Sequence, residues 1–104
     1  VNGIIINDGH EIAIRELVRV IEANPLSADA RVALAQMLQA RGDLAAAIAV
    51  LEQGVTWPRP KGRPDVMFLV TLAKFKEQAG DKAAHDAYMK EAEARARSYG
   101  MAVQ

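Results

Sequence analysis

Apolar residues recur along this chain at intervals of three and four positions, in five segments separated by short polar or glycine-containing stretches. This spacing places the apolar side chains on one face of a helix. The pattern predicts helices over residues 9–23, 28–41, 44–55, 64–79 and 82–98. For residues 1–7 two interpretations stay open, part of an earlier helix or a short extended segment.

Residues that cap or end helices mark several of these boundaries. Asp8, followed by Glu11, forms a capping-box pattern, and Ser27 and Asp43 are placed to cap the next two helices. Gly42 is expected to end the second helix, because glycine adopts the left-handed conformation without strain. Residues 56–64 contain three prolines and a glycine and therefore predict a linker.

The first and third predicted helices repeat one another at a distance of 34 residues. The matching pairs are Ala13 and Ala47, Ile14 and Ile48, Leu17 and Leu51, and Ile21 and Val55. A period of this length is typical of helical hairpins that bury their apolar faces by stacking on neighbouring copies. The pattern predicts a single all-α domain over residues 1–104.

These motifs resemble a tetratricopeptide repeat, which places Leu-Ala or Leu-Gly on its first helix, Gly-Asp at the turn and Ala-Ile on its second helix. Residues 28–61 resemble one complete repeat, with Leu34-Ala35, Gly42-Asp43, Ala47-Ile48 and Pro58 in this order. Residues 8–25 resemble the second half of a preceding repeat. Residues 66–99 resemble a divergent repeat, in which His85-Asp86 replaces Ala-Ile. The resemblance implies an α-solenoid of about five helices, packed as antiparallel pairs in a right-handed superhelix.

The resemblance also implies a function, because members of this family usually bind peptides or helices in a concave groove. The first helix of each pair lines this groove. Here the corresponding positions are Asp29, Val32, Ala33, Gln36, Gln39, Met67, Val70, Thr71, Lys74 and Glu77. We therefore expect a non-catalytic module for protein–protein interaction or assembly, with Gln36, Gln39, Val70 and Lys74 among its contacts.

The linker holds three basic residues, Arg59, Lys61 and Arg63, beside Trp57. Such a loop could contact phosphates of a nucleic acid, with the indole stacking on a base. The alternative is a proline-stiffened linker in which Trp57 covers the end of the third helix. The second interpretation is favoured, because three charges outside a basic helix or groove provide little phosphate contact.

Self-association is a further alternative, because the repeat pattern leaves the first helix without its usual neighbour. If Ile4–Ile6, Ile12 and Val20 are exposed, they require cover from an upstream domain or a second copy. Residues 1–55 carry four basic and seven acidic groups, a net charge of −3, and residues 56–104 carry nine and six, a net charge of +3. This asymmetry could orient neighbouring copies.

Composition and residue types exclude several other sites. The thirteen basic and thirteen acidic residues balance, so no overall charge attracts nucleic acid or a membrane surface. The chain has no cysteine for a disulfide or thiolate metal site. Its longest apolar run, residues 44–51, is far below the roughly 20 residues of a membrane span. We therefore expect a soluble protein, and the sequence leaves open whether it is cytoplasmic or periplasmic. His10 and His85 lack metal-ligand spacing and are expected on polar faces, so no catalytic residue, metal or cofactor is predicted.

Overall fold

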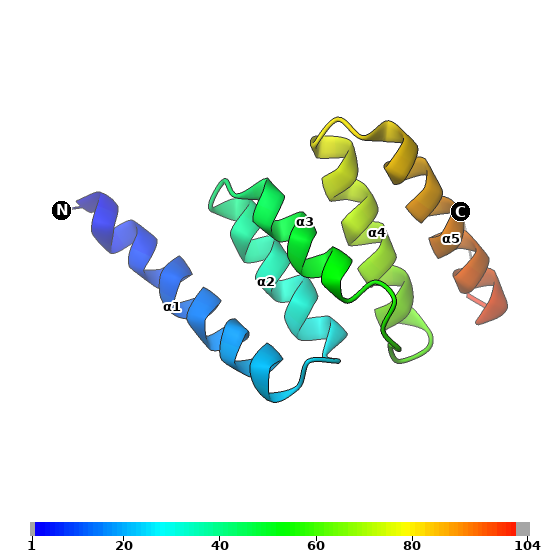
Figure 1. Ribbon diagram of the computed structural model, residues 1–104, viewed down its shortest axis with the longest axis horizontal. Coiled ribbons are helices and arrows are strands. Elements are labelled where there is room, and N and C mark those ends of the chain that lie inside the picture. The colour runs from blue at the N-terminus through cyan, green and yellow to red at the C-terminus, as the bar shows by residue number, and fades with distance from the viewer. Residues whose placement is uncertain (1, 102–104) are drawn as a thin grey trace.

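The computed structural model describes residues 2–101 of the chain, and side chains from His10 onward. Over these residues the fold is all-α, with five helices and no strand (Figure 1). The helices are α1 (Asn2–Ala23), α2 (Ala28–Ala40), α3 (Leu44–Gln53), α4 (Arg63–Gln78) and α5 (Lys82–Ser98).

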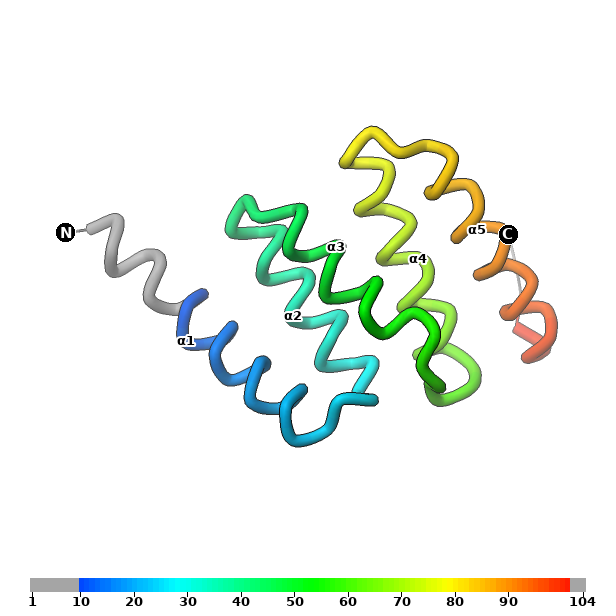
Figure 2. Tube along the Cα trace, viewed as in Figure 1, coloured from blue at the N-terminus to red at the C-terminus, as the bar shows by residue number. Residues whose placement is uncertain are grey.

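Consecutive helices run in alternating directions, with α1 and α5 at opposite ends of an elongated molecule of 50 × 32 × 22 Å (Figures 1 and 2). Helix α2 packs between α1 and α3, and α4 packs against both α2 and α3. Helix α5 packs on α4. An ion pair between Lys76 Nζ and Glu52 Oε2, 3.0 Å apart, joins α4 to α3.

The caps of α2 and α3 confirm the predicted boundaries. Ser27 Oγ accepts a hydrogen bond from the Ala30 backbone N–H at 3.2 Å, and Asp43 Oδ1 accepts one from Ala46 at 3.2 Å. Gly42 has a φ of 95°, the left-handed conformation expected after α2. The bounds of α2 to α5 lie within two residues of those that the sequence predicts.

The predicted start of the first helix near Gly9 is wrong. Helix α1 begins at Asn2, so the Asp8–Glu11 pair lies inside the helix and is no capping box. One glycine or aspartate costs about 1 kcal/mol or less relative to alanine in a helix, which is too little to end it here. Residues 2–7 are therefore helical, while Val1 and the side chains of Ile4–Ile6 lie outside the described part.

The core lies along the contacts of α2, α3 and α4. Ala35, Ala47 and Ala73 have no exposed surface, as expected where helices pack closely. Leu51 and Leu72 are also fully buried. At the end of α3, a Cβ atom on Gly54 would lie 2.9 Å from Arg31 Cδ, so this position admits no larger residue without a shift of the arginine.

On α1 only some of the apolar residues face the core. Ile14 is buried and Leu17 and Ile21 pack against the core, whereas Ile12 is 59% and Val20 46% exposed. The first three share a narrow stripe at intervals of three and four, and Ile12 and Val20 project from other sides.

The buried and half-buried residues of α5 lie along one side of the helix. Ala92 and Ala96 are buried and His85 is half-buried toward α4, whereas Ala87 is exposed. Positions 85, 88, 92 and 96 form one stripe at three- and four-residue spacing, and position 87 lies off it. On α4, the predicted groove residue Met67 is 41% exposed.

Across residues 2–101, none of the helices combines the length and the apolar character that crossing a membrane requires.

Candidate functional site

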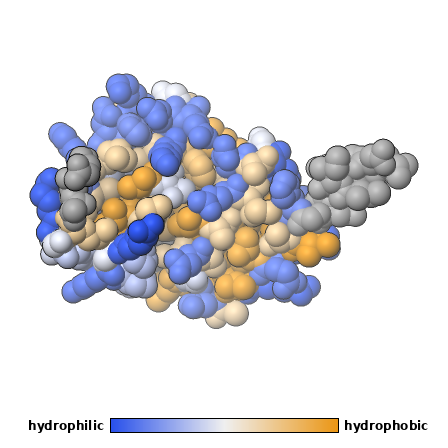
Figure 3. Space-filling model, turned by 180° about the vertical axis from the view of Figure 1, so that it is seen from behind, coloured by the Kyte–Doolittle hydropathy of each residue, from blue (hydrophilic) through white to orange (hydrophobic). Residues whose placement is uncertain are grey.

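Helices α2 and α4 lie next to each other although α3 separates them in the sequence. Gln39 Nε2 on α2 donates a hydrogen bond to Gln78 Oε1 on α4 at 3.3 Å. Figure 1 draws α3 in front of α2, so the rear view in Figure 3 shows the molecule from the side away from α3, where hydrophobic and hydrophilic residues are interspersed.

Eight of the ten residues of the predicted groove form one stripe on each of these two helices. Successive positions are three or four residues apart, which keeps them on one side of each helix. We call these residues the α2–α4 surface: Asp29, Val32, Gln36 and Gln39 on α2, and Met67, Val70, Lys74 and Glu77 on α4.

Burial divides the groove candidates into three groups. The exposed ones are Asp29, Gln36, Met67, Lys74 and Glu77. The half-buried ones are Val32, Ala33, Gln39 and Val70. Thr71 is buried and its hydroxyl donates to the Met67 carbonyl at 2.8 Å, so it supports α4 and offers nothing to a partner.

A second cluster of polar residues lies where the linker meets α4 and α5. Asp65, in the first turn of α4, is only 1% exposed. Its carboxylate accepts hydrogen bonds from Arg59 Nε at 2.9 Å, from Arg95 Nη1 at 3.0 and 3.2 Å, and from the Tyr99 hydroxyl. We call Asp65, Arg59, Arg95 and Tyr99 the Asp65 cluster.

The Asp65 cluster keeps its carboxylate charged although water is excluded from it. Burial raises the pKa of Asp65, but the hydrogen bonds from Tyr99, Arg95 and Arg59 outweigh burial and hold it below its ordinary value. The same contacts raise the pKa of Arg95 and, through the bond to Asp65, that of Tyr99. The cluster is therefore a fixed set of charges that joins the linker, α4 and α5.

Trp57 is held against α2 by a second arginine. The Arg31 guanidinium lies 4.5 Å from the centre of the indole ring, within the range of a cation–π contact. Arg31 is 5% exposed and donates to the carbonyls of Pro25 at 3.2 Å and Val50 at 3.0 Å. The linker therefore folds onto the body of the protein at both Trp57 and Arg59.

These contacts place the predicted basic loop residues in different environments. Arg59 has a side chain only 3% exposed, bound to Asp65, to the Gly54 and Val55 carbonyls and to the Phe68 ring. It is not available to a phosphate. Lys61 and Arg63 are exposed. Only two of the three basic residues in the predicted phosphate-binding loop are therefore exposed.

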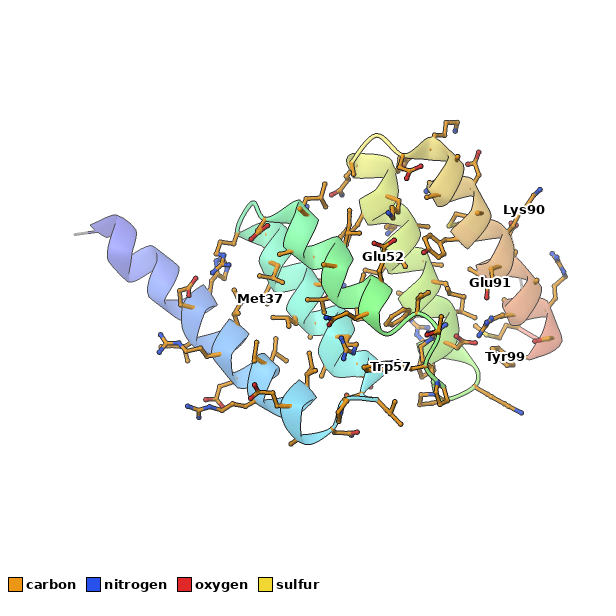
Figure 4. The ribbon with its side chains drawn as sticks, in the orientation of Figure 1. Met37, Glu52, Trp57, Lys90, Glu91 and Tyr99 are labelled. Carbon is orange, nitrogen blue, oxygen red and sulfur yellow. The ribbon has the colours of Figure 1, made fainter. Side chains whose placement is uncertain are left out.

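An open pocket of about 650 Å³ lies between the linker and α5. Trp57, Pro58 and Lys61 line it from the linker, and Tyr88 and Glu91 line it from α5, together with the Asp65 cluster. Figure 4 shows Trp57 on one side and Glu91 and Tyr99 on the other. We call this the linker pocket; its volume lies in the range of pockets that hold small ligands.

His85 packs against α4, contrary to the predicted polar-face position. Its Nδ1 lies 2.9 Å from the Ala73 carbonyl oxygen and its Nε2 lies 4.0 Å from Glu77 Oε2. His10 is half-buried on α1. Among the side chains that the structure describes, residues 10–101, no group of three or more histidine and acidic residues is arranged to hold a metal ion.

No sequence motif marks Asp65, Arg95, Tyr99 or Arg31 as functional residues. An acidic residue in the first turn of a helix is typical of favourable interaction with the helix dipole, so Asp65 carried no special signal. Arg95 and Tyr99 lie 30 and 34 residues further along the chain, and only folding brings them to Asp65.

Comparison of the chain with protein-family models, curated proteins and solved structures finds no match. Any proposal about function therefore rests on the structure itself: the helical fold, the α2–α4 surface and the Asp65 cluster.

Proposed function

We propose that this chain is a tetratricopeptide-like stack of helical hairpins that binds a peptide or a segment of a partner protein on the α2–α4 surface. The observation that carries the proposal is the Gln39–Gln78 hydrogen bond, which joins two helices from different hairpins side by side. Two parallel helices side by side offer a wider surface than a single helix. The shape of this surface exists before the partner binds. A preformed surface lowers the entropic cost of binding.

The side chains of this surface support a moderately polar partner. Met67 is exposed and Val70 half-buried, so apolar contact is available in the N-terminal part of the α4 stripe. The Gln36 amide can both donate and accept hydrogen bonds. The charged residues of this surface are Asp29, Lys74 and Glu77, which give it a net charge of −1. The surface therefore has no strong preference for a positively or a negatively charged partner.

The experiment starts from peptides that are selected for binding to the parent protein from a random display library. Gln36, Gln39, Val70 and Lys74 are then changed together to alanine, and peptide affinity is measured by calorimetry. We expect a loss of tenfold or more, because a few residues carry most of an interface's energy. Peptides that bind this variant as tightly as the parent would overturn the proposal.

A matched control separates the surface from the rest of the molecule. The control variant changes four exposed residues on α1 and α5 to alanine: Arg15, Lys90, Glu93 and Arg97. We expect it to bind the selected peptides as the parent does. Circular dichroism establishes that both variants retain their helix content.

Homo-oligomerisation is the second candidate function, favoured by exposed apolar residues around α1. Ile12, Val20 and Leu26 are 59%, 46% and 51% exposed. The net charge of −3 on residues 1–55 and +3 on residues 56–104 favours contact between unlike halves of two copies. Light scattering that shows a monomer at every concentration and salt level would contradict this alternative.

A further inference from the structure

We propose that the linker pocket binds a small organic anion that carries a planar ring, such as an aromatic phosphate or carboxylate. This site is independent of the α2–α4 surface, because the linker and α5 form it and none of the eight residues of that surface lines it.

The aromatic residues around the pocket favour a planar ring. Trp57, Tyr88 and Tyr99 all line it, and they come from the linker, from α5 and from the residue that follows α5. Aromatic side chains bind flat rings by offset or edge-to-face contacts. Arg31, which does not line the pocket, makes a cation–π contact with the indole of Trp57. The ring is therefore already positioned before a ligand binds.

The charges that line the pocket favour an anion. Arg59, Lys61 and Arg95 supply three positive charges, and Asp65 and Glu91 supply two negative ones, which leaves a net charge of +1. Asp65 is enclosed by Arg59 and Arg95. Lys61 is exposed and joins none of the ion pairs found among residues 10–101, so its ammonium group can bind a ligand without breaking an internal contact.

Glu91 competes with the anion for Arg95. Its carboxylate lies 2.6 Å from Arg95 Nη2, and the side chains of the two residues are 48% and 39% exposed. The pair is one helical turn apart on α5, and such exposed pairs contribute little to stability. A ligand carboxylate or phosphate can therefore replace Glu91 at the outer side of the guanidinium, while Asp65 keeps the inner side.

The test uses phenyl phosphate and benzoate as probes and follows the indole N–H resonance in an NMR titration. Trp57 is the only tryptophan of the chain, so this signal reports on the pocket alone. We expect a saturable shift with both probes, and a much weaker response to inorganic phosphate, to phenol and to benzylamine. The relative affinities of phenyl phosphate and benzoate identify the preferred anion.

Three variants, each with one charge removed, show how individual charged residues affect the affinity for the probes. Lys61→Gln removes the free cation and is expected to weaken binding about two- to fivefold, whereas Glu91→Gln removes the competing carboxylate and strengthens binding by a similar factor. Lys90→Gln makes the same charge change as Lys61→Gln on a side chain that Figure 4 shows pointing away from α5, and it should leave affinity unchanged.

Several results would overturn the proposal. Absence of any shift with the aromatic anions, equal binding of phenol or inorganic phosphate, or tighter binding of benzylamine would each contradict it. Weaker binding by the Glu91→Gln variant would do so as well, since it would mean that the pocket selects a cation.

Discussion

Replacing Asp65 with asparagine keeps the shape of the side chain and removes its charge. In the parent protein the carboxylate accepts hydrogen bonds from Arg59, Arg95 and Tyr99. In the variant the Arg59 guanidinium, whose side chain is 3% exposed, loses the carboxylate that neutralises it. The asparagine NH₂ group also faces N–H and O–H donors, so one of these contacts becomes repulsive.

The expected loss follows from this burial. Breaking a buried ion pair by removing one partner typically costs about 3–5 kcal/mol, and asparagine retains one acceptor, so we expect a loss of about 3 kcal/mol. That is a large part of the 5–15 kcal/mol that stabilises a typical domain. Urea unfolding followed by circular dichroism measures the difference.

Asp86→Asn is the matched control, because Asp86 is exposed and its nearest cation, Lys82 Nζ, lies 3.9 Å away. It should change the free energy of unfolding by no more than about 0.5 kcal/mol. Arg59→Gln combined with Asp65→Asn should cost far less than the sum of the two single changes, since both remove the same interaction. If Asp65→Asn unfolds within about 1 kcal/mol of the parent, the reasoning on the cluster is refuted.

Three further predictions concern stability. Because the pKa of Asp65 is lowered from an ordinary value of about 3.9, its stabilisation is complete above that pH and is lost below it. The difference in unfolding free energy between the parent and Asp65→Asn should therefore shrink as the pH falls toward about 3, and an undiminished difference would contradict this assignment. Ala47→Leu should cost about 1–3 kcal/mol by overpacking a position with no exposed surface, and a variant that melts at the parent's temperature would argue against close packing there. Gly54→Ala should cost about 1–2 kcal/mol, because its Cβ would lie 2.9 Å from Arg31 Cδ, and thermal unfolding checks the value; an unchanged midpoint would show that Arg31 moves without loss.

Local signals in the sequence were sufficient for most of the helix boundaries. Ser27, Asp43 and Gly42 act within three or four residues of themselves, so their roles can be derived without the fold. The start of α1 could not be derived in this way. The polar pair Asp8-Gly9 resembles a helix end locally, whereas helix formation is cooperative and continues through it.

The two candidate sites also differ in how far they can be predicted from the sequence. The groove positions come from the resemblance to a tetratricopeptide repeat, and the Gln39–Gln78 bond shows that the two helices that carry them are adjacent. Binding at this surface itself stays a prediction. The Asp65 cluster depends on contacts between residues far apart in the sequence, which composition and periodicity do not reveal. Arg59 shows the difference, since in the sequence it is one of three similar basic residues and in the fold it is buried.

The position of the linker has a consequence for how the protein opens. In a stack held only by contacts between neighbours, end units are free to open before the rest. Here the linker bonds to α2 through Trp57 and to α4 and α5 through Arg59 and Asp65, so α5 cannot detach without disrupting charges that α4 and the linker share. Amide protons in the last turns of α5 should therefore exchange with solvent as slowly as those in the middle of α4, despite their place at the end of the molecule.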